Sequence, residues 1–332
     1  MKIAIDAMGG DYAPAEIIKG SVLGAREIKG EIILVGPKDR IQEELARHDT
    51  SGLAIEIVHT DEYLIEGEAP AYALRNKRNA SIALATQMVK EGRAQAVISM
   101  GPTGGVITSA MMYLGTVEGI ARPVVGGEFL GFAPQTVAMD IGGNIDAKPE
   151  QMLDFAIVGT VYARKIMSVA NPAVALLNVG KEEGKGNALT KEAYTLLKNS
   201  GLNFIGNIEG NDIVSGKANV IICDGFVGNV MTKFCEGLGR TIAAWLEKEL
   251  ESDLSESRKK ELSRKLLSYT VKADSMGGGP IWAINGLVFK GHGRSRAFEM
   301  AQTIKSAKYF ADLDIVNALK AEIKLVRGKA SS

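Results

Sequence analysis

Glycine-rich turns follow six short apolar runs in this chain, and in five of them glycine stands beside Asp, Asn, Lys or His. These turns are Asp6–Asp11, Ser99–Gly105, Asp140–Asn144, Asn178–Asn187, Asp224–Asn229 and Lys290–Ser295. Glycine lets backbone N–H groups approach a ligand closely, and the N–H groups that open a following helix favour negative charge. Several such turns at one edge of a sheet would form an anion site suited to phosphate. The competing interpretation is that the glycines only make tight turns between strands and helices.

Several other catalytic signatures do not occur in the sequence. The run Gly180–Asn187 lacks the Gly-Lys-Ser/Thr ending of a P-loop, and no Gly-x-Gly-x-x-Gly follows the first predicted strand. The three histidines, His48, His59 and His292, lack metal-ligand spacing, and there is no Gly-x-Ser-x-Gly elbow. We therefore expect no metal, no cofactor and no serine nucleophile.

Alternating strands and helices must position the six turns. Runs rich in Ile, Val, Leu and Ala predict strands at Lys2–Asp6, Glu31–Val35, Ala54–His59, Gln95–Ser99, Thr136–Asp140, Ala173–Asn178, Phe204–Asn207, Asn219–Cys223 and Leu287–Lys290. Intervening helices are predicted at Ser81–Glu91, Met152–Val169 and Thr190–Asn199, with Ser81 and Thr190 as their N-caps where they begin. Several strands are continuously apolar, as in parallel sheets covered on both faces. The pattern predicts an α/β fold with a doubly wound, mostly parallel sheet.

One stretch differs from this alternation. Gly237–Val271 is long, helical and strongly charged, which predicts a projecting helical hairpin. Two apolar stripes follow helical spacing, one formed by Leu238, Ile242, Trp245, Leu246 and Leu250 and the other by Leu262, Leu266 and Tyr269. A cluster of Arg and Lys between residues 258 and 265 lies beside the second stripe. One interpretation is a dimer interface with a solvated face; the other adds contact with an anionic membrane or an acidic carrier protein. With this hairpin included, residues 1–332 read as one large α/β unit, or as two intimately joined subdomains.

Composition limits the functional classes. Lys plus Arg and Asp plus Glu number 39 each, and aromatic residues make up 6%, which argues against nucleic-acid binding. The two cysteines, Cys223 and Cys235, fit a reducing cytoplasm and lie in settings that would not lower a thiol pKa. Met1–Gly10 reads as a strand and turn rather than a signal peptide, and no apolar run reaches membrane-spanning length. We expect a cytoplasmic globular protein.

The opening Asp6–Pro14 resembles the hallmark start of the PlsX family of phosphate acyltransferases. The resemblance continues in order through Ala121–Pro123, Leu176–Asn187, Gly206–Gly210, Cys223–Asn229, Gly277–Pro280, Asn285–Gly286 and Lys290–Gly293. It implies transfer of a long acyl chain from acyl carrier protein to inorganic phosphate, which yields acyl phosphate for phospholipid synthesis. It also implies a fold similar to isocitrate and isopropylmalate dehydrogenases and to phosphotransacetylases, a homodimer, and peripheral membrane association.

Two positions depart from the family pattern. Pro102 stands where the family commonly has Asn, which removes an amide side chain and a backbone donor. Gly143 stands where Ala is usual.

The implied chemistry needs no protein nucleophile, because phosphate itself can attack a thioester once it is held against the carbonyl. Our candidate catalytic residues are Lys185, Asp224, Asn229 and His292. Our candidate phosphate-binding residues are Gly101, Thr103, Gly104, Asn144, Asn178, Gly186 and Asn187. Each has a structural alternative: a solvated loop lysine for Lys185, turn residues for the asparagines, an Asx turn for Asp224 and loop packing for His292.

Rival functions remain open. A phosphotransacetylase acting on short-chain acyl coenzyme A would share the fold and the reaction type. A non-catalytic, membrane-associated scaffold that recruits carrier protein or lipid enzymes is the second alternative. A metal- and NAD-dependent decarboxylating dehydrogenase would need a cluster of metal-binding aspartates that the sequence does not show.

Overall fold

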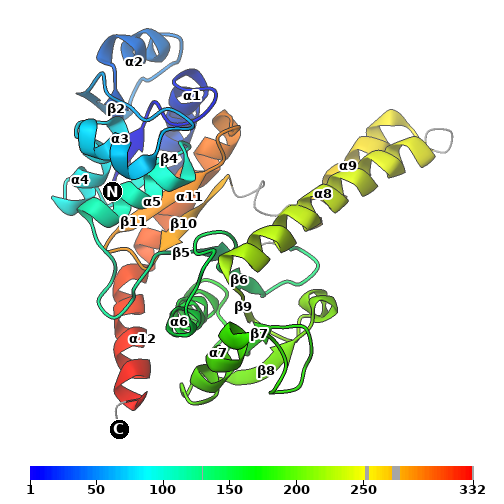
Figure 1. Ribbon diagram of the computed structural model, residues 1–332. Coiled ribbons are helices and arrows are strands. Elements are labelled where there is room, and N and C mark those ends of the chain that lie inside the picture. Colours follow the sequence, from blue (N-terminus) through cyan, green and yellow to red (C-terminus); the bar gives the residue numbers. More distant parts are fainter. Residues whose placement is uncertain (129, 251–253, 271–276, 331–332) are drawn as a thin grey trace. The chain divides into compact units, whose positions relative to one another are not determined.

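The structure is a computed structural model that describes residues 1–128, 130–250, 254–270 and 277–330 (Figure 1). The chain divides into two compact units. The first consists of residues 1–118 and 276–317, and the second of residues 119–275 and 318–332. Each unit has its own set of strands, and the two are described in turn.

The first unit is built on a mostly parallel sheet. Its strands are β1 (Lys2–Asp6), β2 (Glu31–Gly36), β3 (Ala54–His59), β4 (Ala96–Ser99), β10 (Gly278–Trp282) and β11 (Leu287–Gly291). Their order is β3-β2-β1-β4-β11-β10; all pairs are parallel except β10 with β11. The centre of β1 is fully buried, as expected for strands covered on both faces. The carboxyl ends of β1, β4 and β11 therefore meet at one edge.

Helices surround this sheet. They are α1 (Ala15–Ile28), α2 (Lys38–Leu45), α3 (Pro70–Asn76), α4 (Ser81–Lys90), α5 (Thr103–Tyr113), α11 (Ala297–Asp312) and the start of α12 (Ile315–Ala330). A Cβ added at Gly20 of α1 would lie 2.5 Å from Cβ of Met300 in α11, so glycine lets these two helices pack closely. The core between α4, α5 and the sheet is formed by small and branched aliphatic side chains.

The second unit repeats the design with different strands. They are β5 (Val124–Gly127), β6 (Val137–Met139), β7 (Val174–Leu177), β8 (Phe204–Ile208) and β9 (Val220–Ile222), in the order β5-β6-β9-β7-β8. The last four strands in this order are parallel, and β5 is antiparallel to β6. Its helices are α6 (Pro149–Lys165), α7 (Ala188–Lys198), a 3-10 helix (Gly210–Ser215), α8 (Gly225–Glu249) and α9 (Glu256–Thr270). The end of α12 also belongs to this unit.

The helices α8 and α9 lie side by side as a hairpin (Figure 1). The hydroxyl of Ser263 donates to the carbonyl of Ala243 at 3.3 Å. A Cβ at Gly239 would lie 2.1 Å from Oγ1 of Thr270, so the two helices are in direct contact there. The predicted hairpin Gly237–Val271 includes residues 251–253 and 271, which lie outside the described residues.

Charged side chains attach the end of α12 to α6. Arg164 pairs with Glu322 at 2.6 Å, and the guanidinium of Arg327 donates to the carboxylate of Asp154 at 2.5 Å. Asp154 is only 2% exposed, and its burial raises its pKa despite this partner. The carboxyl-terminal helix is therefore part of the second unit's packing.

The mostly parallel α/β architecture predicted from the sequence is confirmed. All nine predicted strands occur, with ends that match or differ by one residue. Both predicted N-caps were wrong: α4 is preceded by Ala80, and Asn187 rather than Thr190 caps α7. The reason is local. Oδ1 of Asn187 accepts the N–H of Thr190, and the hydroxyl of Ser81 donates to the carboxylate of Asp6 instead of capping α4. Within the described ranges, no helix is long and apolar enough to cross a membrane.

Candidate functional site: strand-end loops in both units

Three loops of the first unit meet at the carboxyl ends of β1, β4 and β11. The N–H of Asp11 donates to the carbonyl of Gly293 at 2.8 Å, which joins the loop after β1 to the loop after β11. A Cβ at Gly9 would lie 2.7 Å from the backbone nitrogen of Gly101, so the loops after β1 and β4 are in direct contact. Within this unit, the predicted convergence of glycine-rich turns is present.

These loops line a pocket of about 260 Å3. Its lining residues are Met8, Gly10, Asp11, Ala13, Arg40, Tyr63, Leu64, Ile65, Glu66, Met100, Gly101, Pro102 and Gly293. Apolar side chains and glycine backbone make up most of the wall, with Arg40, Asp11 and Glu66 as charged members. Such a mixed lining suits an organic ligand with a few polar groups.

The helix α5 begins beside this pocket. Pro102 occupies its N-cap position with an extended ψ of 130°, and its carbonyl accepts the N–H of Val106. Thr103 and Gly104 are exposed in the first turn, where backbone N–H groups lack helical acceptors. Gly104 also has a packing role, because an added Cβ would lie 2.9 Å from Cγ of Pro70. The departure at Pro102 is thus compatible with the start of the helix, and the anion-favouring first turn is retained.

His292 also lies in the first unit. It is half-buried in the loop after β11, and its carbonyl accepts the N–H of Ser295 at 3.0 Å. The backbone of His292 is thus held in a tight turn, and the catalytic role of its side chain stays a prediction.

In the second unit, the loops after β6 and β9 interlock. The carbonyl of Asn144 accepts the N–H of Gly225 at 2.9 Å, and the amide nitrogen of Asn144 donates to the carbonyl of Pro123. A Cβ at Gly228 would lie 2.1 Å from the carbonyl oxygen of Asp140. The first turn of α8 therefore sits directly on the loop after β6, and the side chain of Asn144 helps to hold that loop.

Asp140 organises this loop. It is fully buried and has a left-handed φ of 63°, a conformation that costs energy for a residue with a side chain. Its carboxylate accepts the N–H of Gly143 at 2.7 Å and that of Asn144 at 2.8 Å. Burial raises its pKa, and these N–H groups oppose the rise. Sequence reasoning did not select Asp140, although its place after a strand and before two glycines was a usable signal.

Asp224 and Asn229 flank the start of α8. Oδ1 of Asp224 accepts the N–H of Val227 at 2.9 Å, so the buried carboxylate is the N-cap of α8. Asn229 is exposed one turn further on, with its side chain near Gly142. The structural alternative for Asp224, a capping turn, is present, and its catalytic role stays a prediction.

The loop after β7 carries Lys185. The amide of Asn178 holds this loop: its nitrogen donates to the carbonyl of Lys185 at 3.1 Å, and its oxygen accepts the N–H of Val179. Gly186 has a φ of 99° and leaves no room for a side chain, because an added Cβ would lie 2.0 Å from Oγ1 of Thr190. The side chain of Lys185 is exposed. Strand order places this loop next to the loop after β9.

A group of charged residues stands behind the β7 loop. Asp212 accepts from Lys181 and Lys217, each at 3.0 Å. Hydrogen bonds from these two ammonium groups lower the pKa of Asp212 to about 2. The amide of Asn207 donates to the carbonyl of Glu182 at 2.9 Å. These contacts tie the β7 loop to the end of β8.

Neither cysteine is an activated nucleophile. Cys223 is buried and donates to the carbonyl of Asp140 at 3.4 Å, and its burial raises its pKa. Burial also raises the pKa of Cys235. A thiol with a raised pKa stays protonated and attacks carbonyls poorly. Among the described residues, no group of three or more His, Cys, Asp or Glu side chains could hold a metal ion.

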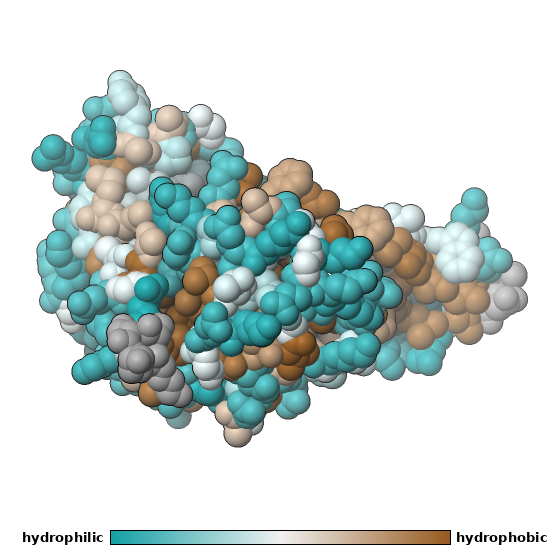
Figure 2. All heavy atoms as spheres, turned by 60° about the horizontal axis from the view of Figure 1, so that its bottom comes forward, coloured by the Kyte–Doolittle hydropathy of each residue, from teal (hydrophilic) through white to brown (hydrophobic). Residues whose placement is uncertain are grey.

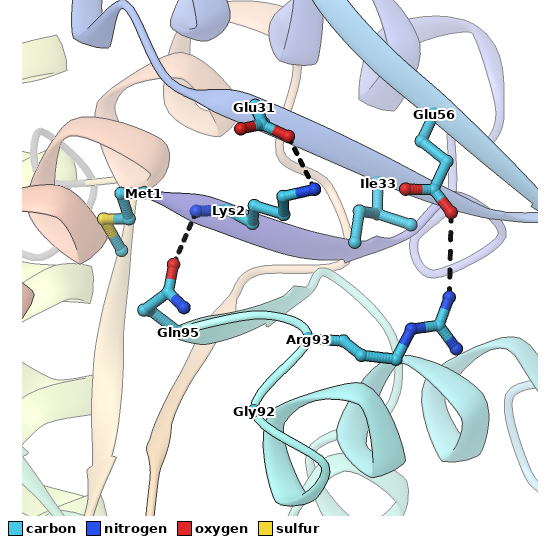
Figure 3. A pocket seen from close by; sticks show the side chains of 8 residues that line it. All are labelled: Met1, Lys2, Glu31, Ile33, Glu56, Gly92, Arg93 and Gln95. Carbon is cyan, nitrogen blue, oxygen red and sulfur yellow. Dashed lines mark hydrogen bonds and ion pairs between the residues drawn. The ribbon is translucent and has the colours of Figure 1, made fainter.

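A second pocket lies at the opposite edge of the first unit's sheet, by the amino ends of β1 and β2 (Figure 3). Its volume is about 390 Å3. Figure 3 shows its charged groups paired with one another, Lys2 with Glu31 at 2.7 Å and Arg93 with Glu56 at 3.6 Å. Ligands of open parallel sheets bind beyond the carboxyl ends, so we do not assign the site here.

The candidate residues thus fall into two groups. Gly101, Thr103, Gly104 and His292 belong to the first unit, at the carboxyl ends of β4 and β11. The second unit holds the remaining seven: Asn144, Asn178, Lys185, Gly186, Asn187, Asp224 and Asn229. The side chains of Asn144, Asn178, Asn187 and Asp224 hold the loops through hydrogen bonds. The side chains of Lys185 and Asn229 are exposed.

Comparison with solved structures defines the fold class. A phosphotransacetylase from Streptococcus pyogenes matches with a TM-score of 0.60 and 19% identity, over 97% of this chain and 94% of that chain. A 4-hydroxythreonine-4-phosphate dehydrogenase from Burkholderia phymatum matches with a TM-score of 0.51 and 11% identity, over 94% and 98%. The chain therefore has the α/β fold shared by these two kinds of enzyme.

Sequence comparison gives the family. A family model described as a fatty acid synthesis protein matches residues 1–318. A phosphate acyltransferase of Moorella thermoacetica is 42% identical over 340 aligned positions, which cover all of both chains. One of Dictyoglomus turgidum is 42% identical over 325 positions, 95% of each chain. The chain belongs to this family, the PlsX family of phosphate acyltransferases, and the resemblance of its motifs is confirmed.

Proposed function

We propose that this chain transfers a long acyl group from acyl carrier protein to inorganic phosphate, and so supplies acyl phosphate for phospholipid synthesis. The observation that carries the proposal is full-length membership in a family whose relatives are named phosphate acyltransferase. The glycine-rich loops at the carboxyl ends of the strands agree with it, because they present backbone N–H groups suited to an anion.

The proposed reaction is direct acyl transfer. A phosphate oxygen forms a bond to the thioester carbonyl carbon, and the carbonyl oxygen carries the negative charge of the tetrahedral intermediate. The C–S bond then breaks, the acyl phosphate is released, and the carrier leaves as a thiolate that is protonated from solvent. The two raised thiol pKa values support phosphate, rather than a cysteine, as the nucleophile.

We assign the exposed polar groups of the second unit to charge stabilisation. Lys185 binds phosphate or polarises the carbonyl, and Asn229 donates a hydrogen bond to phosphate or to the oxyanion. Asn178, Asn187 and Asp224 hold the loops in place through the contacts described above. His292 and the first turn of α5 are the corresponding candidates in the first unit.

The test is a trapping assay. The protein is incubated with long-chain acyl carrier protein and phosphate, and hydroxylamine converts any acyl phosphate to a hydroxamate. Phosphate-dependent hydroxamate is the expected result. Its absence with both acyl carrier protein and acyl coenzyme A would overturn the proposal in favour of a scaffold.

A second candidate function is short-chain phosphotransacetylase activity with acyl coenzyme A. The fold likeness to the Streptococcus pyogenes phosphotransacetylase is the observation in its favour. The same assay separates the two functions when acyl length and carrier are varied. Turnover that is faster with acetyl coenzyme A than with a long-chain acyl carrier protein would establish the second.

We further propose that the protein acts in the cytoplasm as a homodimer that pairs through α8. Large apolar side chains are exposed along one face of this helix, at positions 226, 230, 234, 238 and 245. Figure 2 shows hydrophobic atoms gathered along the arm formed by α8 and α9. Spacings of four and seven residues align these side chains in one stripe, here called the α8 stripe. The alternative occupant of the stripe is a membrane surface.

A further inference from the structure

A polar cluster lies beneath the pocket of the first unit. Asp6 ends β1, Ser99 ends β4 and Ser81 begins α4. Oγ of Ser81 lies 2.6 Å from Oδ1 of Asp6, and Oγ of Ser99 lies 2.7 Å from Oδ2. Asp6 is 5% exposed and each serine 1%. These three buried groups join two strands and a helix.

The hydrogen bonds of the cluster have a definite direction. The N–H of Gly101 donates to Oγ of Ser99 at 3.0 Å, so the hydroxyl proton of Ser99 points to Asp6. The N–H of Met8 donates to Oδ1 of Asp6 at 3.2 Å. The hydroxyl of Ser81 donates to the same oxygen. Asp6 is therefore the common acceptor for donors from both loops.

The packing above the cluster leaves no space for a side chain at Gly9. A Cβ at Gly9 would lie 2.6 Å from both Oδ2 of Asp6 and Oγ of Ser99. The loop after β1 thus passes directly over the carboxylate and against the loop after β4. Burial raises the pKa of Asp6, while the two serine hydroxyls oppose the rise. A buried carboxylate is costly, and an arrangement that fixes two loops is one reason to retain it.

The two loops that Asp6 joins supply seven of the pocket's lining residues. Those from the loop after β1 are Met8, Gly10, Asp11 and Ala13, and those from the loop after β4 are Met100, Gly101 and Pro102. Leu64 and Ile65 add apolar side chains to the same lining. This lining suits the organic donor better than inorganic phosphate, because phosphate would gain little from apolar walls.

We propose that Asp6 is a positioning residue which, through Ser99 and the N–H of Met8, holds the loops after β1 and β4 in the arrangement that binds the acyl thioester donor. The part that concerns the donor rests on the proposed function. Asp6 does not touch the reacting atoms, and its effect passes through the loops.

Ser99→Ala and Ser81→Ala form a matched pair of test variants. Each removes one hydroxyl that donates to Asp6, but only Ser99 also accepts from the pocket loop. We expect Ser99→Ala to raise the KM for the acyl donor about tenfold, since it orphans the buried N–H of Gly101. The KM for phosphate should stay near that of the unaltered protein. Ser81→Ala should change the donor KM less than about threefold at a similar loss of thermal stability.

Amide hydrogen exchange gives a readout that does not need turnover. Ser99→Ala should speed exchange at Gly101, and Asp6→Ala should speed it at Met8, because each N–H loses its side-chain acceptor. Ser81→Ala should leave the exchange of Gly101 unchanged. The comparison is made on the full chain at equal temperature.

Two results would overturn the inference. One is equal donor KM values for the two serine variants, and the other is unchanged exchange at Gly101 in Ser99→Ala. If the unaltered protein shows no phosphate-dependent turnover, the proposed function fails separately, and the exchange comparison still decides whether Asp6 positions the loops.

Discussion

At the scale of single residues, the exposed lysine of the β7 loop is the most direct test of the proposed chemistry. The loop around Lys185 is held by Asn178 and by a glycine with a left-handed φ, so its position does not depend on the lysine's own charge. Its side chain is exposed, and removal of the amine should leave the fold intact.

We expect Lys185→Ala to lower the turnover number about 100- to 1,000-fold, the effect of losing one donor to developing negative charge. The hydroxamate assay measures it, with thermal melting as the check on folding. Lys191→Ala is the matched control, since Lys191 is an exposed lysine on the following helix α7. Near-normal turnover of Lys185→Ala would show that Lys185 is a solvated loop residue.

Residue chemistry could be predicted only in part from the sequence. The turns around Asn187 and Asp224 were recognised and a structural role was left open for each, but the cap of α7 was assigned to Thr190 instead of Asn187. The cluster of Asp6, Ser81 and Ser99 was not predicted, because its members are 75 and 93 positions apart in the chain. No local spacing reports such a contact, since it forms only when the sheet brings β1, β4 and α4 together.

At the scale of helices and strands, hydrophobic patterning was informative for the parallel strands and silent for the two antiparallel ones. The strands β5 and β10 contain glycines, Gly126 and Gly127 in one and Gly278 and Gly279 in the other. Glycine is disfavoured in strands by propensity, so both segments read as loops. The pairing with neighbours overrides that propensity. A Cβ at Gly126 would lie 2.4 Å from the carbonyl oxygen of Ala138, so close approach to β6 requires glycine there.

Two glycines of α8 give a prediction about this element. Gly228 faces the carbonyl of Asp140, and Gly237 faces open space. Gly228→Ala should lower the free energy of unfolding by about 1–3 kcal/mol, because backbone must move to admit the methyl group. Gly237→Ala should raise it by about 0.5–1 kcal/mol through helix propensity.

Urea denaturation of both variants measures the difference. Opposite shifts of the transition midpoint are expected. A loss of stability in Gly237→Ala as large as that in Gly228→Ala would contradict the close packing between α8 and the loop after β6.

At the scale of the whole molecule, the family assignment rests on motifs spread in order along nearly the entire chain, and this was readable from the sequence. The division into two units was one of two interpretations left open by the sequence, but the bounds of the units were not readable, because the segments of each unit are discontinuous. The α8 stripe was recognised in part: Leu238 and Trp245 belonged to the predicted apolar face, whereas Phe226, Val230 and Phe234 lay before the stretch considered.

The proposed dimer gives the prediction at this scale. Phe234 is 66% exposed at the centre of the α8 stripe. Phe234→Glu places a charge where an apolar contact would form, and it should convert the dimer to a monomer in light scattering after gel filtration. Tyr72→Glu, at a residue 73% exposed on α3, is the control and should remain dimeric.

Two outcomes would argue against this pairing. An unaltered protein that is monomeric contradicts the dimer directly. A Phe234→Glu variant that stays dimeric but no longer floats with anionic liposomes would assign the stripe to a membrane surface instead.

The strand order of the first unit also bears on how the chain folds as it is synthesised. The strand β11 pairs with β4, although Leu287 follows its partner Ala96 by roughly 190 positions. A ribosome adding about 5–20 residues per second needs on the order of 10–40 s to cover that distance. During this interval β4 has an unpaired edge, whereas the strands of the second unit, β5–β9, are synthesised and can pair with one another. We therefore expect the strands β5–β9 to pair before the first unit is complete, with the strands β1–β4 exposed to chaperones until β11 arrives.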